Sequence, residues 1–176
     1  LVGLVGSEMC IRDSDQSGWS VSLSDDGTIM AVGGKQNDAG NSSSDNRGHV
    51  RIFKHNGTAW TQLGADIDGE AAGDNSGDSV SLSADGTKVA IGAYGNDGTA
   101  LAAGHVRIYN YTPSGTASWT QLGADIDAEA STDYSGYSVS LSADGTKVAI
   151  GAYQNDAGNS SSDNRGHVRI YNYNGT

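Results

Sequence analysis

Apolar residues recur at every second position in short runs along most of the chain. Between Val80 and Ile91, valine, leucine and isoleucine alternate with serine, alanine and glycine on both sides of Asp85-Gly86. A period of two is typical of β-strands, and Asp-Gly supplies the positive φ of a tight two-residue hairpin turn. Further strands are predicted at 105–111 and 119–126, and no window of eleven residues keeps a helical period. The pattern therefore predicts an all-β chain.

This strand pattern repeats along the chain at a fixed interval. It restarts at Asp15, Asp74 and Asp133, which are 59 residues apart. Within the copies, residues 36–52 are identical to 154–170, and residues 79–94 are identical to 138–153. Four short strands repeated at this length are typical of a propeller blade, which buries its apolar faces against its neighbours. The sequence therefore predicts a partial β-propeller of about three four-stranded antiparallel blades.

We assign the three blades to residues 15–73, 74–132 and 133–176. The third copy stops before its fourth strand, so we expect the propeller to be incomplete at both ends, with the remaining blades of the parent chain as partners. Residues 1–14 match no later part of the sequence, and residues 4–14 resemble the translation of a transposase-type sequencing adapter. We therefore treat residues 1–14 as non-native and expect no fold for them.

The charge balance excludes several classes of partner. The 176 residues include 21 acidic and 10 basic side chains, for a net charge of −11. Such a charge argues against nucleic acid and anionic lipid as partners. No apolar run approaches the roughly 18 residues that span a membrane. The single cysteine excludes an internal disulfide and a paired-cysteine metal site, and we expect no cofactor.

Three motifs of each repeat together resemble a known family. In the second copy they are Ser-Gly-Asp-Ser-Val at 76–80, Asp-Gly-Thr-Lys-Val-Ala-Ile-Gly-Ala-Tyr at 85–94 and Gly-His-Val-Arg-Ile-Tyr at 104–109. This set resembles the FG-GAP repeat, the propeller blade of integrin α subunits. The resemblance implies a non-enzymatic interaction or adhesion module, extracellular or at the cell surface. Two other functions stay open: a structural repeat array without a specific ligand, and an accessory propeller of a larger secreted enzyme.

A ligand, either protein or glycan, is expected on one rim of the propeller. Successive strands reverse direction, so the loop after the second strand and the connection after the fourth strand emerge on the same rim, opposite the Asp-Gly turns. Positions that differ between the copies are the best candidates there, and they include the aromatic residues Trp19, Tyr134 and Tyr137. Polar candidates in the loops are Asp38, Asn41 and Asp45 in the first copy and Asp156, Asn159 and Asp163 in the third.

Calcium binding is the alternative interpretation for the acidic residues, and we do not favour it. The calcium loop of the resembled family is not carried over, because a two-residue turn with one acid cannot supply six to eight oxygens. The connections after the fourth strand are denser in acids, and we interpret them as solvated turns. The candidate calcium ligands in these connections are Asp66, Asp68, Glu70, Asp74, Asp125, Asp127, Glu129 and Asp133.

Two repeated residue types are expected to serve the blade itself. His49, His105 and His167 each follow a glycine at the start of the third strand, where hydrogen bonding is favoured over metal binding or catalysis. Trp60 and Trp119 open the fourth strand, and packing is favoured over sugar stacking.

Overall fold

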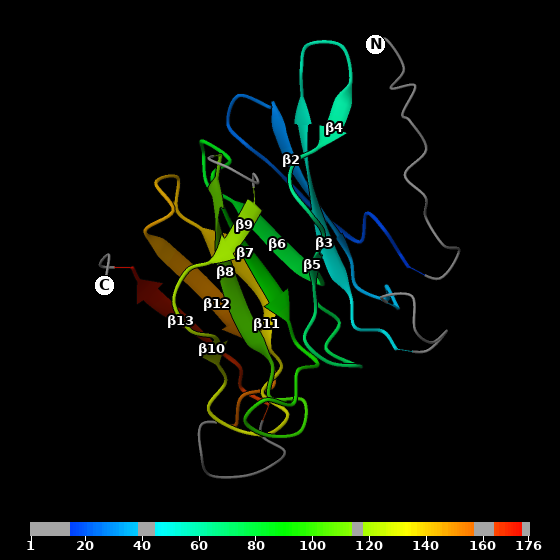
Figure 1. Cartoon of the computed structure of the whole chain (residues 1–176). Coiled ribbons are helices and arrows are strands. Elements are labelled where there is room, and N and C mark those ends of the chain that lie inside the picture. Colours follow the sequence, from blue (N-terminus) through cyan, green and yellow to red (C-terminus); the bar gives the residue numbers. More distant parts are fainter. Residues whose placement is uncertain (1–14, 39–44, 114–117, 157–163, 174–176) are drawn as a thin grey trace.

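Three antiparallel β-sheets lie side by side in the computed structural model, which describes residues 15–38, 45–113, 118–156 and 164–173 (Figure 1). The first sheet contains β1 (Ser20–Leu23), β2 (Ile29–Gly34), β3 (His49–His55), β4 (Trp60–Gln62) and β5 (Ile67–Asp68). The second contains β6 (Ser79–Leu82), β7 (Lys88–Ala93), β8 (His105–Thr112), β9 (Ser118–Gln121) and β10 (Ile126–Asp127). The third contains β11 (Ser135–Leu141), β12 (Lys147–Ala152) and β13 (His167–Asn172). The predicted all-β character is confirmed.

Each sheet is a meander in which consecutive strands pair, but the predicted fourth strand is not continuous. In the second sheet both β9 and β10 pair with β8. Between them the amide of Leu122 donates to the carbonyl oxygen of Ile108 (2.7 Å), and Gly123 then adopts a φ of +78°. A positive φ turns the backbone away from the ladder, and glycine adopts it without steric cost. The prediction of a single strand over 119–126 was therefore wrong.

The Asp-Gly turns are also longer than predicted. Between β6 and β7 the amide of Ser83 donates to the carbonyl oxygen of Lys88 (3.0 Å), so residues 84–87 form a four-residue loop instead of a two-residue turn. Gly86 has a positive φ, but Asp85 does not. The carboxylate of Asp85 instead accepts hydrogen bonds from the hydroxyl of Ser83 (2.7 Å) and the amide of Thr87 (3.0 Å). These bonds close the loop on itself.

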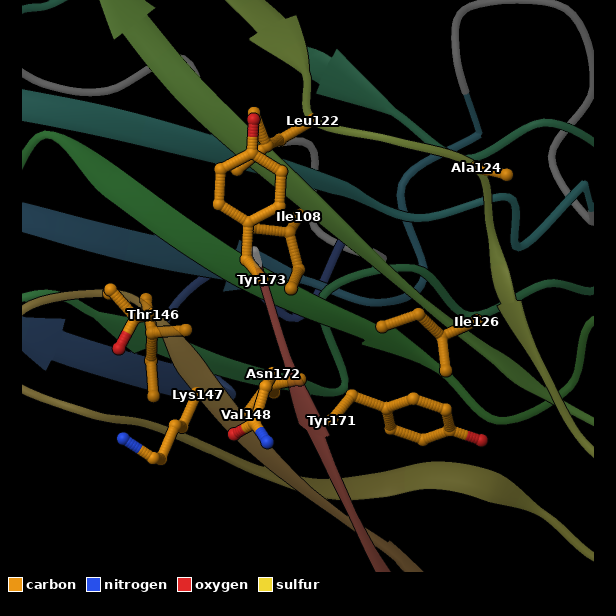
Figure 2. Close-up of a pocket in the computed structure, with 12 residues that line it drawn as sticks. Ile108, Leu122, Ala124, Ile126, Thr146, Lys147, Val148, Tyr171, Asn172 and Tyr173 are labelled. Atoms are coloured by element: carbon orange, nitrogen blue, oxygen red, sulfur yellow. The ribbon is translucent and has the colours of Figure 1, made fainter. Parts of the chain in front are cut away.

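Apolar side chains from neighbouring sheets form the core. The first cluster joins the first and second sheets and contains Ala31, Val50, Ile52, Ile67, Leu82, Val89, Ile91 and Tyr109. The second joins the second and third sheets and contains Ala90, Val106, Leu141, Val148 and Ile150. Figure 2 shows the outer part of this second junction. Burying each large aliphatic side chain contributes about 1.5–3 kcal/mol. Each sheet therefore depends on its neighbour for stability, as expected of a repeat architecture.

The two junctions between sheets use the same polar contacts. The hydroxyl of Ser20 donates to the carbonyl oxygen of Gly77 (2.6 Å), and the hydroxyl of Ser79 donates to that of Gly136 (2.7 Å). A Cβ atom built on Gly92 would lie 2.0 Å from the same Gly136 oxygen. Only glycine permits this approach between backbones, so the sheets meet closely near their first strands. No helix among the described residues is long and apolar enough to cross a bilayer.

Candidate functional site

The loops on the rim opposite the Asp-Gly turns are bonded to each other between neighbouring sheets. The amides of Asn75 and Ser76, which precede β6, donate to the carbonyl oxygens of Asn46 (3.1 Å) and Arg47 (3.0 Å), which precede β3. At the next junction the amide of Ser135 donates to the carbonyl oxygen of Ala103 (2.9 Å). The loop after the second strand therefore lies beside the connection that enters the next sheet.

Four tyrosines form a cluster on this rim at the junction between the second and third sheets. Tyr137 and Tyr153 have ring centroids 4.6 Å apart, and Tyr134 stacks on Tyr153 at 5.5 Å with an interplanar angle of 22°. Tyr94 from the second sheet contacts Tyr134 at 5.8 Å and Tyr137 at 5.9 Å. Tyr137 and Tyr153 remain 49% and 46% exposed. We call these four residues the tyrosine cluster.

The backbone conformation of Tyr134 is common to all three repeats. Tyr134 has a φ of +52°, and the equivalent residues Gln16 and Asn75 have φ values of +49° and +54°. The left-handed conformation therefore belongs to the blade, and the tyrosine side chain is what differs in the third copy. Burial, followed by the charge of Asp78, raises the pKa of Tyr94, and burial followed by Tyr134 raises the pKa of Tyr153. The hydroxyls of Tyr94 and Tyr153 are therefore neutral hydrogen-bonding groups at physiological pH.

The corresponding positions at the first junction carry a different set of side chains. Lys35 occupies the position of Tyr94, and its ammonium group donates to the carboxylate of Asp78 at 3.0 Å. The same ammonium group lies 3.2 Å from the ring centroid of Trp19, whose side chain is 56% exposed. Asp78 corresponds to Tyr137 in the repeat. The rim is therefore ionic at one junction and aromatic at the next.

Of the predicted aromatic ligands, Tyr134 and Tyr137 both belong to the tyrosine cluster, where each contacts Tyr94. The third, Trp19, lies at the first junction beside Lys35. Sequence reasoning missed Tyr94 and Tyr153. The sequence does mark these two residues, because the equivalent position in the first copy is a lysine while the residues around it are repeated.

The predicted polar ligands serve their own loops. The carboxylate of Asp38 accepts from the amide of Asn46 (3.0 Å), and that of Asp156 accepts from the amide of Asn164 (2.7 Å). Asp45 is buried and lies 3.5 Å from Arg47. Asn41, Asn159 and Asp163 lie outside the described residues.

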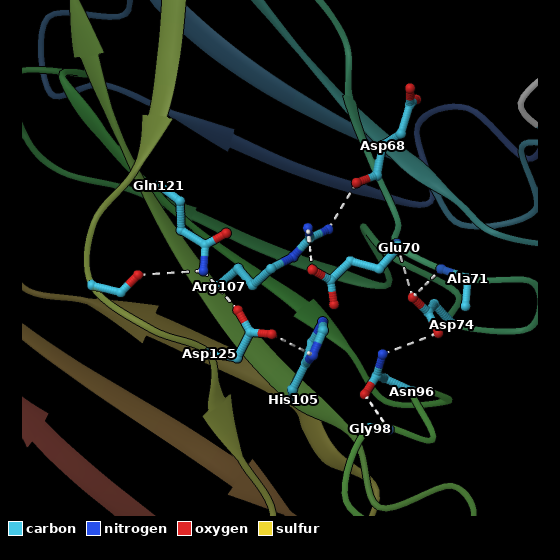
Figure 3. A network of polar contacts seen from close by, with 11 residues as sticks. Asp68, Glu70, Ala71, Asp74, Asn96, Gly98, His105, Arg107, Gln121 and Asp125 are labelled. Atoms are coloured by element: carbon cyan, nitrogen blue, oxygen red, sulfur yellow. Dashed lines mark hydrogen bonds and ion pairs between the residues drawn. The ribbon is translucent and has the colours of Figure 1, made fainter.

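Two of the candidate calcium ligands anchor the connections between sheets. Asp74 is 1% exposed, and one carboxylate oxygen accepts from the amides of Glu70 (3.0 Å) and Ala71 (2.9 Å). Its other oxygen accepts from the side-chain amide of Asn96 at 3.1 Å (Figure 3). The carboxylate of Asp133 likewise accepts from the amide of Ala130 and from the side-chain amide of Asn155, each at 3.0 Å. Their hydrogen bonds assign both residues a structural role.

The other candidate acids lie around the histidines and arginines of the third strands, of which His49, His105 and Arg107 are buried. In the second sheet, Asp125 lies 3.8 Å from Nδ1 of His105, and Glu70 lies 3.6 Å from the guanidinium of Arg107 (Figure 3). That guanidinium also donates to the carbonyl oxygen of Asp68 (2.7 Å). Burial, followed by the charge of Arg107, lowers the pKa of His105, so the ring is neutral at pH 7.

The same arrangement recurs in the neighbouring sheets. Asp66 accepts from Arg51 at 2.9 Å and lies 3.6 Å from His49. The third sheet has Arg169, whose guanidinium donates to the carbonyl oxygen of Asp127 (2.7 Å) and lies 3.7 Å from Glu129. His167 lies 3.9 Å from Glu129, so the first histidine of each third strand lies beside an acid, and the arginines supply countercharge.

Two triads in this network have ligand atoms within 4.8 Å of one another: His49 with Asp66 and Asp68, and His105 with Glu70 and Asp125. One nitrogen and two carboxylates are a donor set for ions such as Zn²⁺, whereas Ca²⁺ takes oxygens only. The arginine beside each triad balances one of its two carboxylate charges.

Comparison with known proteins bears on the fold alone. No family model matches the chain, and no curated protein matches it. A putative 6-phosphogluconolactonase from Bacteroides uniformis has a similar structure, with a TM-score of 0.52 and 12% identity, over 92% of this chain and 45% of that chain. Hydrazine synthase from Kuenenia stuttgartiensis aligns with a TM-score of 0.46 and 11% identity, over 84% of this chain and 32% of that chain. The chain therefore spans less than half of either structure. The predicted fold class, a partial β-propeller, is confirmed.

Proposed function

We propose that this chain is a non-enzymatic interaction module that binds a protein partner through the tyrosine cluster. One observation carries the proposal: four tyrosines from two blades contact one another on the rim, and two of them remain about half exposed. Tyrosine is enriched at protein interfaces because it combines a large rigid apolar ring with a hydrogen-bonding hydroxyl. The proposed extracellular or cell-surface location and FG-GAP membership rest on the motif resemblance described above.

The arrangement of the rings supports a protein ligand over a glycan. Tyr137 lies tilted by 53° to Tyr153 and by 66° to Tyr94, so the rings of the cluster do not form one flat face. Sugar stacking uses a flat ring face, whereas edges and hydroxyls suit the side chains and backbone of a protein surface. The net charge of −11 favours a partner whose surface is neutral or basic.

The variation between copies supports a binding role over a purely structural array. The strands of the second and third copies are nearly identical, while Asn75 and Asp78 in the second are replaced by Tyr134 and Tyr137 in the third. A structural array needs no such change on an exposed rim. An accessory role in a larger enzyme has no support among the side chains described above.

Selection of peptides from a random display library on the immobilised chain tests this proposal. We expect the enriched peptides to bind the wild-type chain and to lose at least about tenfold in affinity for a Tyr137→Ala, Tyr153→Ala double variant. Leu101→Ala is the matched control, because Leu101 is 68% exposed on the same rim and lies outside the cluster. Equal binding to the double variant would refute the proposal. Binding confined to a glycan array would also refute it.

A further inference from the structure

Three side chains with metal-ligand atoms meet where the connection between the first and second sheets passes β8 (Figure 3). Glu70 lies in that connection, His105 begins β8, and Asp125 lies just before β10. One ligand atom of each residue lies within 4.8 Å of the other two. Ligand atoms about 2.0–2.2 Å from a tetrahedral ion are roughly 3.4 Å apart, so a small closure would bring these three atoms onto one ion.

The histidine contributes a buried nitrogen without a partner. His105 is 1% exposed, and its Nε2 forms no hydrogen bond with any of the described residues. The hydrogen bonding predicted for this histidine is therefore not found at Nε2. Figure 3 shows the ring pointing from β8 toward Glu70, with Asp125 beside it. A buried polar atom without a partner is costly, and a neutral imidazole nitrogen is the commonest metal ligand in proteins.

The charges around the imidazole favour a cation. Glu70 and Asp125 carry two negative charges, and Arg107, whose guanidinium lies 3.6 Å from Glu70, supplies one positive charge. The buried carboxylate of Asp74 also acts electrostatically on the imidazole. The group therefore keeps a net negative charge, which attracts a cation.

Both carboxylates are able to reach an ion. The side chain of Glu70 is 47% exposed, and its separation of 3.6 Å from Arg107 is longer than a hydrogen bond. Arg107 is anchored on the carbonyl oxygen of Asp68 (2.7 Å), so Glu70 can turn without it. One oxygen of Asp125 accepts from the side-chain amide of Gln121 at 2.6 Å, which leaves the other oxygen facing the imidazole. Supporting hydrogen bonds of this kind orient metal-ligating carboxylates.

The corresponding group in the first sheet is less suited to an ion. There the oxygen of Asp66 that faces His49 accepts a hydrogen bond from Arg51 at 2.9 Å. The other oxygen of Asp66 accepts from Gln62 at 2.6 Å, so both oxygens are engaged. Among the described residues, no arginine forms an ion pair with Asp125. The two groups therefore differ in the carboxylate that is available to a cation.

We propose that Glu70, His105 and Asp125 form a site for a divalent cation of borderline hardness, best matched by Zn²⁺. One imidazole nitrogen and two carboxylates supply three ligands, and water completes a tetrahedron. A mixed nitrogen and oxygen donor set favours Zn²⁺ over Ca²⁺ and Mg²⁺, which take oxygens. Glu70 comes from the connection between blades and the other two ligands from the second blade, so the ion would tie that connection to β8. The site is separate from the tyrosine cluster.

Titration of the metal-free 176-residue chain with Zn²⁺ tests the proposal. Calorimetry at pH 7 should show saturable binding, and Zn²⁺ should raise the melting temperature because it binds the folded chain. Glu70→Gln and Asp125→Asn should each weaken binding at least about tenfold, since each removes a charged ligand. Co²⁺ in place of Zn²⁺ should give visible absorption bands that both variants lose.

Two control variants should leave the affinity for Zn²⁺ unchanged. Asp68→Asn removes the same charge from an exposed acid two residues from Glu70. Cys10→Ser removes the single thiol, which lies outside the described residues. Thermal melting confirms that each variant is folded.

Three outcomes would overturn the proposal. The first is no saturation up to about 1 mM Zn²⁺. The second is a loss of affinity in Asp68→Asn or Cys10→Ser equal to that in Glu70→Gln, because the ion would then bind elsewhere or without a defined site. The third is displacement of Zn²⁺ by an equal concentration of Ca²⁺, because a site that uses an imidazole nitrogen prefers Zn²⁺.

Discussion

Replacing Gly92 by alanine should separate the second and third blades at their closest approach. A Cβ atom at this position would lie 2.0 Å from the carbonyl oxygen of Gly136 and 2.3 Å from the hydroxyl oxygen of Ser79. Real Cβ atoms essentially never approach another heavy atom closer than 3.0 Å. The hydroxyl can rotate away, but the carbonyl belongs to the backbone of the third blade. The two backbones must therefore move apart.

The expected cost has two parts. Overpacking of a tight interior contact costs about 1–3 kcal/mol. The displaced carbonyl also loses its hydrogen bond from Ser79, which is 2.7 Å long and contributes about 1 kcal/mol. Gly92→Ala should therefore reduce the free energy of unfolding by about 2–4 kcal/mol. For a chain of this size the melting temperature should fall by about 4–16 °C.

The third blade provides a matched control. Gly151 has the same place in the repeat as Gly92, but its added Cβ would meet only Ser138 within 3.7 Å, at a distance of 2.3 Å from the hydroxyl oxygen. That side chain can rotate, so Gly151→Ala should be nearly neutral, or stabilising by about 0.4–1 kcal/mol because alanine restricts the unfolded chain.

Urea denaturation followed by tryptophan fluorescence and by circular dichroism measures both variants. Agreement between the two probes is required before a free energy is assigned, because repeat arrays can unfold in stages. Ser79→Ala alone should cost about 1 kcal/mol and isolates the hydrogen-bond part. Equal losses for Gly92→Ala and Gly151→Ala, or no loss for either, would refute the idea that backbone approach between blades makes glycine necessary.

Three further outcomes follow from the same contacts. Trp119→Phe should cost about 1–2 kcal/mol in urea denaturation, because it removes the indole hydrogen bond, whereas Trp60→Phe should cost less, since no indole hydrogen bond of Trp60 is found among the described residues. Because the pKa of His105 is lowered in the folded chain, the unfolded chain binds a proton at this residue at a higher pH than the folded chain does. The free energy of unfolding should therefore fall as the pH drops below 6.5, by up to about 1.4 kcal/mol per pH unit. His105→Gln should flatten that dependence in denaturation curves between pH 5 and pH 8, and an unchanged slope would contradict the assignment. Hydrogen bonds from Ser142 and Thr146 lower the pKa of Asp144 from 3.8, so Asp144→Ala should lower the melting temperature by a few degrees at pH 7, with the difference disappearing well below pH 3.8.

The repeat and the strand alternation were sufficient to predict the sheets, because both arise within a single blade. The period of two around Asp85-Gly86 places Val80, Leu82, Val89 and Ile91 on one face; Leu82, Val89 and Ile91 belong to the first core cluster, and Val80 packs against it. The break in the fourth strand was missed because it depends on the φ of Gly64 and Gly123, which glycine permits but does not impose.

The candidate site was less predictable because its contacts cross from one blade to the next. Tyr94 meets Tyr137 only when two sheets pack at a particular angle, and the sequence separation of 43 residues gives no indication of this contact. The buried role of Asp74 was missed for a similar reason. Its partner Asn96 lies in a loop 22 residues away, and the local sequence around Asp74 predicts only a solvated turn.

The hydrogen bonds from Ser20 to Gly77 and from Ser79 to Gly136 join successive blades in the same way. Each blade therefore offers the same hydroxyl donor to the blade that follows it, so the contacting strand surfaces are interchangeable. Duplication or loss of a whole blade in the gene would then produce a matching junction without any new side chain. The rim differs between the two junctions: Lys35 meets an acid at one, while Tyr94 meets a tyrosine at the next. A change in the order of the blades would preserve the contacts between their strands and would change which side chains meet on the rim. The arrangement of binding groups can therefore evolve separately from the fold.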